Sequence, residues 1–163
     1  MAGTARAFVG VGANLCDAMA TVRVALQALR ELPDTRCIAC SSLYRSAPVE
    51  AEGPDFVNAV AELRTTLPPP ALLQRLQAIE QDFGRVRSVR NAPRTLDLDL
   101  LLYGDTVMHG DELTLPHPRL HLRAFVLRPL VELDPALALP GIGPLEPWLQ
   151  RAADQPIERI GAA

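Results

Sequence analysis

The sequence predicts an α+β fold, because strand-like and helix-like patterns follow one another in the order strand, helix, strand, strand, helix, strand. The helical segments carry apolar residues at helical spacing, and the strand segments are short, apolar and bounded by Gly, Pro or Ser. This order is a βαββαβ core, in which a mostly antiparallel sheet carries both helices on one face. No repeat or linker interrupts the chain, so residues 1–163 are expected to form a single domain that includes a C-terminal extension.

Apolar stripes and helix-ending residues predict the two helices. The prolines at residues 68–70 suit the first turn of the second helix, while Leu32-Pro33 and Gly84 end the first and second helices. The stripes consist of Val22, Leu26 and Leu29 in the first helix and Leu72, Leu76, Ile79 and Phe83 in the second.

The strands are identified by short apolar or alternating segments next to turn signals. They are predicted at residues 6–11, 37–45, 56–64 and 95–103. Gly104-Asp105 predicts a turn after the last of them, and residues 107–109 are expected to add a short edge strand. In the C-terminal extension, helices are expected over residues 122–133 and 145–152.

Charge and composition exclude several classes of protein. The chain has 16 basic and 19 acidic residues and a net charge of −3, which argues against a general binder of nucleic acid or of membrane surfaces. Every basic residue is arginine. The absence of lysine excludes a Walker-type phosphate loop and a Schiff-base lysine, so arginine side chains, backbone N–H groups or metal ions must hold any bound anion.

The cysteines favour a reducing compartment. The chain has 3 cysteines and no secretory signal pattern, so a cytoplasmic location is expected. Cys37 and Cys40 have CxxC spacing, but a second pair is missing, and both are expected to be sheet or core residues rather than a redox or zinc site. The apolar runs are too short to span a membrane.

Two carboxylates on the last predicted strand are the most informative feature. Regular alternation places Leu96, Leu98, Leu100 and Leu102 on one face and Asp97, Asp99, Leu101 and Tyr103 on the other. Because the leucines require burial, Asp97 and Asp99 should lie side by side with Cα atoms about 6–7 Å apart. Mg²⁺ prefers such hard oxygen ligands and leaves room for substrate phosphates.

The residues before this strand decide between a solvated strand face and a phosphate site. Arg85, Arg87, Arg90 and Arg94 lie in a segment without any acidic residue that runs directly into the carboxylate strand. Arginine binds phosphate oxygens in bidentate fashion, and the aspartates would supply a metal. The alternative is a solvated loop with counter-ions, but cations and carboxylates at one strand edge favour a phosphate site.

Three further polar residues are candidates for a nucleotide site. Gln77 and Glu80 share one flank of the second helix, where they face either a nucleotide or solvent. His117 lies between two prolines in a loop after the carboxylate strand, where a single histidine is commonly structural. The Gly10-Val-Gly12 segment is not a dinucleotide fingerprint, because Leu15 occupies the third glycine position.

These segments together resemble the 6-hydroxymethyl-7,8-dihydropterin pyrophosphokinases of the folate pathway, over nearly the whole chain. The resemblance is carried by Phe8-Val-Gly-Val-Gly-Ala-Asn-Leu15, Ser41-Ser-Leu-Tyr-Arg-Ser46 with Pro48, Phe56-Val-Asn58, Gly84-Arg-Val-Arg87, Pro93-Arg-Thr-Leu-Asp-Leu-Asp99, Pro116-His117 and Arg123-Ala-Phe125. It implies a ferredoxin-like fold and transfer of pyrophosphate from ATP to the pterin hydroxymethyl oxygen, with release of AMP.

The resemblance also implies roles for individual residues. Asp97 and Asp99 would bind two Mg²⁺ ions that bridge the phosphates, and Arg85 and Arg94 would stabilise charge on the transferring group. The ATP site would consist of Gln77, Glu80, Arg87, Arg90, His117 and Arg123. The pterin site would consist of Phe56 and Phe125 as stacking rings, Asn58 on the pterin edge, and backbone groups around Ser46 and Val49. The expected partners are ATP and the pterin, with no nucleic acid or membrane, and the chain is expected to be a monomer.

The sequence departs from the family pattern at three places. Asn91-Ala92 replaces an aromatic-Gly pair before Pro93, so the resemblance assigns no role to Asn91. Pro118 stands where the family often has Tyr, which removes a hydrogen-bonding hydroxyl. Phe56 stands where Tyr is common, so stacking is kept and the hydroxyl is lost.

Other classes of function remain as alternatives. The arginine-rich segment would suit a ferredoxin-like nucleic-acid-binding module, although the acidic pI of about 5.6 and the 4% aromatic content argue against it. Paired aspartates also occur in palm-like nucleotidyltransferases, which release pyrophosphate rather than AMP and normally need a longer chain. A purely structural or regulatory small-molecule module would leave the paired aspartates unexplained.

Overall fold

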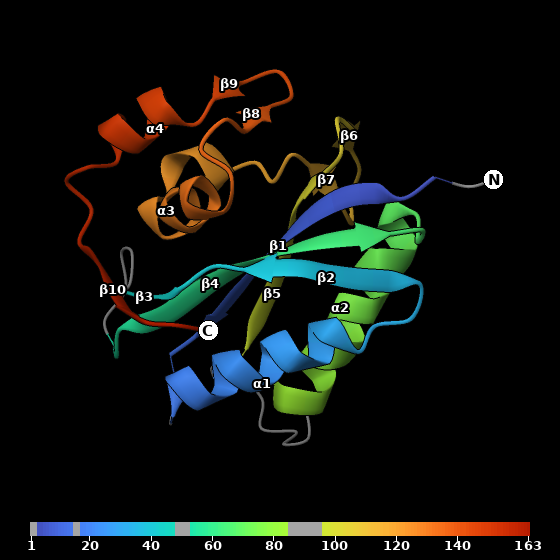
Figure 1. The fold of residues 1–163 in the computed structure, drawn as a ribbon, viewed down its shortest axis with the longest axis horizontal. Coiled ribbons are helices and arrows are strands. Elements are labelled where there is room, and N and C mark those ends of the chain that lie inside the picture. The colour runs from blue at the N-terminus through green and yellow to red at the C-terminus, as the bar shows by residue number, and fades with distance from the viewer. Residues whose placement is uncertain (1–2, 15–16, 48–52, 85–95) are drawn as a thin grey trace.

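The computed structural model describes residues 3–14, 17–47, 53–84 and 96–163. The N-terminal part contains β1 (Ala5–Ala13), α1 (Ala18–Arg30), β2 (Thr35–Cys40), β3 (Leu43–Ser46), β4 (Phe56–Thr65), α2 (Pro69–Gly84) and β5 (Asp97–Tyr103). The remainder contains β6 (Met108–His109), β7 (Thr114–Leu115), a 3-10 turn (Leu120–Leu122), α3 (Ala124–Leu133), β8 (Ala138–Leu139), β9 (Gly143–Pro144), α4 (Glu146–Arg151) and β10 (Ile157–Gly161). A central sheet separates α1 and α2 from α3 and α4, which gives three layers (Figure 1).

The main sheet has the strand order β10-β3-β4-β1-β5, and β2 also pairs with β4. Each of these pairs is antiparallel, so the predicted α+β class with an antiparallel sheet is confirmed, although one predicted strand of the βαββαβ order is split into β2 and β3. The register places Gly12 of β1 opposite both Asn58 of β4 and Asp97 of β5. Two residues with different chemistry therefore flank one glycine on neighbouring strands.

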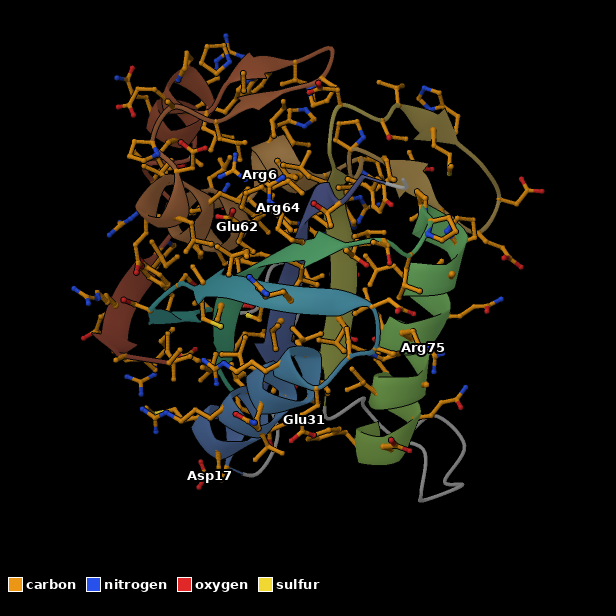
Figure 2. The ribbon with its side chains drawn as sticks, turned by 45° about the vertical axis from the view of Figure 1, so that its right-hand side comes forward. Arg6, Asp17, Glu31, Glu62, Arg64 and Arg75 are labelled. Atoms are coloured by element: carbon orange, nitrogen blue, oxygen red, sulfur yellow. The ribbon has the colours of Figure 1, made fainter. Side chains whose placement is uncertain are left out.

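The face under α1 and α2 holds the first hydrophobic core, as the helical stripes predicted. α1 begins after Asp17 (Figure 2), whose side chain caps the helix by accepting a hydrogen bond of 3.1 Å from the N–H of Ala20. The predicted stripe residues Val22, Leu26, Leu29, Leu72, Leu76 and Ile79 are all buried in this core, and Phe83 packs against it. Both helices thus lie on one face of the sheet.

The C-terminal extension covers the opposite face and forms a second core. Leu127 and Leu130 of α3 are fully buried there, together with Phe8 of β1. An ion-pair network borders this core. Arg6 of β1 donates a hydrogen bond of 3.0 Å to Glu62 of β4 (Figure 2), and Nη2 of Arg6 lies 3.0 Å from a carboxylate oxygen of Asp134 after α3. The predicted helix over residues 122–133 is therefore a 3-10 turn followed by α3, and it closes the second face.

The single strand predicted at residues 37–45 is wrong, because the chain forms two strands there. β2 and β3 both pair with β4, and Ser41 and Ser42 separate them. The Ser41 hydroxyl accepts a hydrogen bond of 2.9 Å from the N–H of Val60, while the N–H of Ser42 donates to Glu132 of α3 at 2.9 Å. Side-chain oxygens thus replace ladder partners at this break, which apolar patterning does not reveal.

The alternation predicted for residues 96–103 holds only as far as Leu100. Val9 lies opposite Leu100 and Phe8 opposite Leu102, so Leu101 is an extra residue that forms a β-bulge. As a result, Leu102 joins the core under α3, and Tyr103 packs against the core under α2, opposite to the prediction. Asp97, Asp99 and Leu101 still share the α3 side.

The last part of the chain is more ordered than its proline-rich sequence predicts. The short strand expected at residues 107–109 exists as β6, but it pairs with β7 rather than with the main sheet. The helix expected at residues 145–152 is α4, whereas β10, which pairs with β3, was not predicted. In the part of the chain that the structure describes, no helix combines the length and apolarity needed to cross a membrane.

Candidate active site

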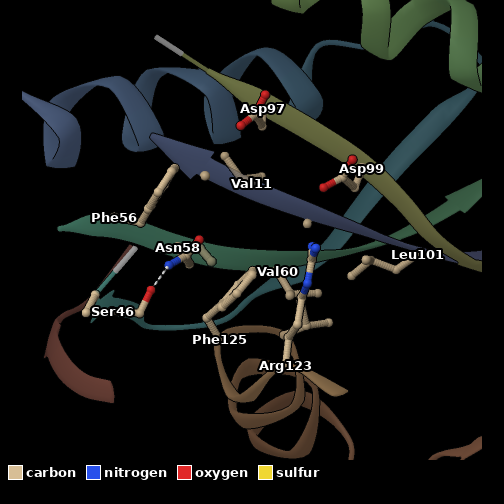
Figure 3. Close-up of a pocket in the computed structure, with 15 residues that line it drawn as sticks. Val11, Ser46, Phe56, Asn58, Val60, Asp97, Asp99, Leu101, Arg123 and Phe125 are labelled. Carbon is tan, nitrogen blue, oxygen red and sulfur yellow. Dashed lines mark hydrogen bonds between the residues drawn. The ribbon is translucent and has the colours of Figure 1, made fainter. Parts of the chain in front are cut away.

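A pocket of about 220 Å³ opens on the α3 side of the sheet, where β1, β4 and β5 meet the start of α3 (Figure 3). The sequence-predicted residues that line it are Ser46, Phe56, Asn58, Asp97, Asp99, Arg123 and Phe125. They come from β3, β4, β5 and the beginning of α3, which are far apart in the sequence. The fold therefore brings together residues that the sequence assigned to two different ligands.

The carboxylates of Asp97 and Asp99 come from the same face of β5, as alternation predicted (Figure 3). Their partners on β1 are Gly12 and Gly10, so no side chain of the neighbouring strand covers them. Asp97 is half-buried and Asp99 is exposed. The Leu101 bulge follows directly, and bulges commonly re-aim side chains beside active sites.

The two glycines of β1 line the pocket, which sequence analysis missed. A Cβ atom on Gly12 would lie 3.0 Å from Oδ1 of Asn58, and one on Gly10 would lie 3.4 Å from the Leu101 side chain. Gly10-Val-Gly12 was rejected as a dinucleotide motif and otherwise entered only as part of a segment that carries the family resemblance, with no role in a site. Glycines inside a predicted strand also indicate that a ligand or another backbone approaches closely, and this signal could have identified Gly10 and Gly12 as pocket residues.

A buried amide and a buried hydroxyl form the polar wall of the pocket. Nδ2 of Asn58 donates a hydrogen bond of 2.8 Å to Oγ of Ser46, across the β3–β4 pair (Figure 3). Both residues are buried, and this bond fixes the amide so that Oδ1 faces Gly12. The amide therefore presents a fixed acceptor at the pocket, where most of the remaining wall is apolar.

Two partly exposed aromatic rings stand at the pocket. Phe56 begins β4 and Phe125 lies in the first turn of α3, and each is half-buried rather than part of the core (Figure 3). The guanidinium carbon of Arg123 lies 5.4 Å from the centre of the Phe125 ring, within range for a cation–π contact. Partly exposed rings in a pocket are suited to stacking on a flat ligand.

His117 stands beside the carboxylates without lining the pocket itself. Its backbone N–H donates a hydrogen bond of 2.9 Å to the carbonyl of the bulge residue Leu101, and its side-chain Nδ1 accepts one of 3.2 Å from the backbone N–H of Arg119. Burial lowers the pKa of His117, the nearby Asp99 opposes this shift, and Arg123 and Arg119 add to it. The ring is therefore held neutral near pH 7.

Of the other predicted residues that the structure describes, Glu80 and Gln77 of α2 do not line the pocket. Glu80 of α2 accepts a hydrogen bond of 2.9 Å from the N–H of Leu98, between the two aspartates, and so ties α2 to the carboxylate strand. Gln77 is exposed on α2. Outside the described residues lie Val49, Arg85, Arg87, Arg90, Asn91 and Arg94.

Asp97 and Asp99 are the carboxylates that could hold a metal at this pocket. Within residues 3–14, 17–47, 53–84 and 96–163, no group of three or more His, Cys, Asp or Glu side chains gathers around one point. Two neighbouring carboxylates fit Mg²⁺, which binds through one or two carboxylates and fills its other positions with water and substrate phosphates.

The sequence of this chain matches that of a known protein family over residues 8–135, a stretch that contains every residue of the pocket. The chain belongs to the 7,8-dihydro-6-hydroxymethylpterin-pyrophosphokinase (HPPK) family. A Pseudomonas aeruginosa relative named 2-amino-4-hydroxy-6-hydroxymethyldihydropteridine pyrophosphokinase is 45% identical, over 97% of this chain and 98% of its own length. A Haemophilus influenzae relative with the same name is 39% identical, over 94% of this chain and 97% of its own length.

Solved structures of HPPK-DHPS proteins share the fold. One from Plasmodium falciparum superposes with a TM-score of 0.75 at 13% identity, over 93% of this chain and 46% of that chain. Another, solved with substrates, gives a TM-score of 0.73 at 12% identity, over 91% of this chain and 43% of that chain. This chain thus spans less than half the length of those proteins, and at this identity the likeness concerns the fold alone.

Proposed function

We propose that this HPPK-family chain transfers pyrophosphate from ATP to 6-hydroxymethyl-7,8-dihydropterin, producing AMP and the pterin diphosphate in folate biosynthesis. One observation carries the proposal: a fixed amide between two partly exposed aromatic rings opens into the same pocket as two neighbouring carboxylates. A flat heterocycle with a hydrogen-bonding edge suits the first group, and a phosphate–magnesium complex suits the second.

The pterin end of the pocket is formed by β3, β4 and α3. Phe56 and Phe125 would stack on the ring, and Asn58 would match its hydrogen-bonding edge. The Asn58 amide is already held by Ser46, so pterin binding would not have to order it. Backbone groups near Ser46 and Val49 would complete this end, although Val49 lies outside the described residues.

The phosphate end is formed by β5 and the residues around it. Asp97 and Asp99 would hold two Mg²⁺ ions, which supply charge neutralisation on the phosphates. Arg85 and Arg94 would stabilise the transferring group, with Arg87, Arg90 and Arg123 close to the phosphates. Gln77, Glu80 and His117 would contact ATP, and a neutral His117 can donate one hydrogen bond without adding charge.

The reaction forms a bond between the pterin hydroxymethyl oxygen and the β-phosphorus of ATP. The bond from that phosphorus to the oxygen bridging it to the α-phosphate breaks, AMP leaves, and the hydroxyl proton passes to solvent. The pocket would contribute by holding the two substrates end to end, which makes the transfer effectively intramolecular. A cytoplasmic location and a monomeric chain remain part of this proposal.

Incubation with ATP, Mg²⁺ and 6-hydroxymethyl-7,8-dihydropterin tests the proposed activity. Anion-exchange chromatography should detect AMP and pterin diphosphate in equal amounts, and no AMP when the pterin is omitted. Formation of ADP, or release of pyrophosphate, would contradict the proposal, because the first indicates simple phosphoryl transfer and the second nucleotidyl transfer.

A further inference from the structure

A β-bulge places two cysteines of β2 on the same face of the sheet. In β2, Cys37 lies opposite Leu63 and Ala39 opposite Glu62, so Ile38 is the extra residue. Residues three positions apart in a regular strand face opposite sides, but the bulge shifts the alternation by one. Cys37 and Cys40 therefore both pack against the core under α1, and their Sγ atoms are 3.7 Å apart.

Arg30 of α1 makes the two thiols unequal. Its Nη2 donates to Sγ of Cys40 at 3.5 Å, while its Nη1 donates to the Gln27 side chain at 3.3 Å. The hydrogen bond from Cys37 and the positive charge of Arg30 outweigh burial and lower the pKa of Cys40 to about 7. The same hydrogen bond raises the pKa of Cys37. At neutral pH, a substantial fraction of Cys40 is thus thiolate and nucleophilic, while Cys37 stays protonated.

The thiol pair is accessible and separate from the candidate active site. Both cysteines are free and half-buried, and β2 pairs only with β4, so its other edge carries no strand among the described residues. The pair lies on the α1 side of the sheet, whereas the pocket opens on the α3 side. The proposed pyrophosphoryl transfer makes no use of these thiols.

We propose that Cys37 and Cys40 form a redox-active dithiol that low-molecular-weight disulfides, such as glutathione disulfide, convert reversibly into an intramolecular disulfide. CxxC spacing alone predicted plain sheet residues. The proposal rests on the bulge, the sulfur–sulfur contact and the position of Arg30.

The exchange takes place in two balanced steps. The Cys40 thiolate attacks one sulfur of glutathione disulfide, and a mixed disulfide forms as one glutathione thiolate leaves. Cys37 then loses its proton to solvent and attacks Sγ of Cys40, which releases the second glutathione thiolate. Oxidation of the dithiol gives up two electrons and two protons, which convert one glutathione disulfide into two glutathione thiols. The Sγ atoms of Cys37 and Cys40 must approach to about 2.05 Å for the new bond to form.

The test uses the full chain with Cys16→Ser, so that Cys37 and Cys40 are its only cysteines. Treatment with glutathione disulfide at pH 7 should lower the intact mass by two hydrogen atoms, and reduction should restore it. In the additional variant Cys37→Ser, whose hydroxyl still donates to Cys40, the glutathione adduct should accumulate on residue 40. At pH 7 this adduct should form about fivefold faster than the adduct of an ordinary thiol. Cys40 has a larger thiolate fraction than an ordinary thiol, and this outweighs the lower nucleophilicity of its thiolate.

Two matched variants separate the proposed cause from general thiol reactivity. Among the described residues, the charged and titratable groups that act on Cys40 are Cys37 and Arg30. Arg30→Gln in the Cys37→Ser background should therefore slow adduct formation at pH 7 and move the midpoint of its pH profile upward from about 7. The counterpart Cys40→Ser leaves Cys37 alone and should react more slowly still.

Circular dichroism first establishes that each variant is folded, and iodoacetamide labelling gives a second rate for the same thiols. If glutathione disulfide leaves two adducts per chain and no intramolecular disulfide, the proposal is wrong. It is equally wrong if Cys40 reacts with the pH profile of an ordinary thiol.

Discussion

At the scale of single residues, Gly12 lies where three strands meet. It pairs with Asn58 on one side and Asp97 on the other, and its missing Cβ leaves room for the Asn58 amide. The Asn58 amide is also held by Ser46. Substitutions of Gly12 or Asn58 should therefore reduce ligand affinity more than they reduce the stability of the fold.

Asn58→Ala should weaken pterin binding by roughly 1–3 kcal/mol, because it leaves polar groups of the ligand unpaired in a closed site. ATP affinity should stay nearly unchanged, since the phosphates are assigned to the arginines and the metal. Calorimetric titration of each ligand measures both effects. Equal losses for ATP and pterin would contradict this placement of the pterin edge.

Phe56→Ala and Phe125→Ala should likewise reduce pterin affinity. Each should destabilise the free protein by less than the roughly 3–5 kcal/mol that the loss of a core phenylalanine ring costs.

Gly12→Ala should reduce pterin affinity through the Asn58 amide. The new Cβ would lie 3.0 Å from Oδ1 of Asn58, and the bond to Ser46 restrains the amide from moving away. Gly10→Ala is the matched control on the same strand, because its Cβ would meet the flexible Leu101 side chain at 3.4 Å. Titration with the pterin should show the larger loss for Gly12→Ala, and an equal loss in both variants would oppose the steric explanation.

Asp99→Asn should lower the turnover rate, because a carboxylate that holds a metal contributes several kcal/mol of transition-state stabilisation. Folding should survive, because Asp99 is exposed and its removal relieves repulsion from Asp97. Asp105→Asn, an exposed residue in the turn after β5, is the control and should retain normal rates. Steady-state kinetics at saturating Mg²⁺ provide the comparison, in which near-normal turnover of Asp99→Asn would exclude the metal role.

At the scale of elements, Glu132 connects α3 to β3. Its carboxylate accepts hydrogen bonds from the Ser42 N–H at 2.9 Å, the Ser42 hydroxyl at 2.9 Å and the Tyr44 hydroxyl at 2.5 Å. Burial would raise the pKa of Glu132, but the hydrogen bonds from Tyr44 and Ser42 prevail and lower it below 4.5. These hydrogen bonds hold α3, whose first turn carries Phe125, against β3, which ends at Ser46.

Glu132→Gln should destabilise the protein by about 1 kcal/mol at pH 7, a modest value because the residue is partly solvent-exposed. Since folding lowers the carboxyl pKa, its contribution is fully present above pH 4.5 and is lost as the pH falls through the folded-state value. Thermal denaturation of both proteins between pH 3 and 7 should therefore show curves that converge at low pH. A constant difference across this range would contradict the role of the ionised carboxylate.

At the scale of the whole molecule, one sheet separates two cores. Leu76 of α2 is fully buried in the first core and Leu127 of α3 in the second. The pocket lies on the α3 side, so the second core also supports Arg123 and Phe125.

Leu76→Ala and Leu127→Ala should each destabilise the chain by about 2–5 kcal/mol. Leu127→Ala should in addition weaken pterin binding at temperatures where the protein remains folded, because α3 carries Phe125. Denaturant unfolding and pterin titration measure the two effects separately. Equal pterin affinity in the two variants would show that α3 does not position the pocket through Leu127.

Local patterns in the sequence determined the class of fold and the carboxylate pair of the candidate site. The apolar stripes of the two helices, such as the one that ends in Ile79 and Phe83, predicted which helix faces are buried. This works because apolar residues on the buried face of a helix recur with the helical period. The same reasoning placed Asp97 and Asp99 on one face of a strand, and the resemblance to a family added Ser46, Phe56, Asn58 and Phe125.

Only the tertiary structure decided the features that depend on pairing between distant strands. The bulges at Ile38 and Leu101 follow from registers with β4 and β1, so a short local pattern cannot reveal them. The contact between Gly12 and Asn58 likewise depends on the approach of two separate strands. Residue type and spacing determine which chemistry the chain carries, whereas register and packing decide which of those groups meet.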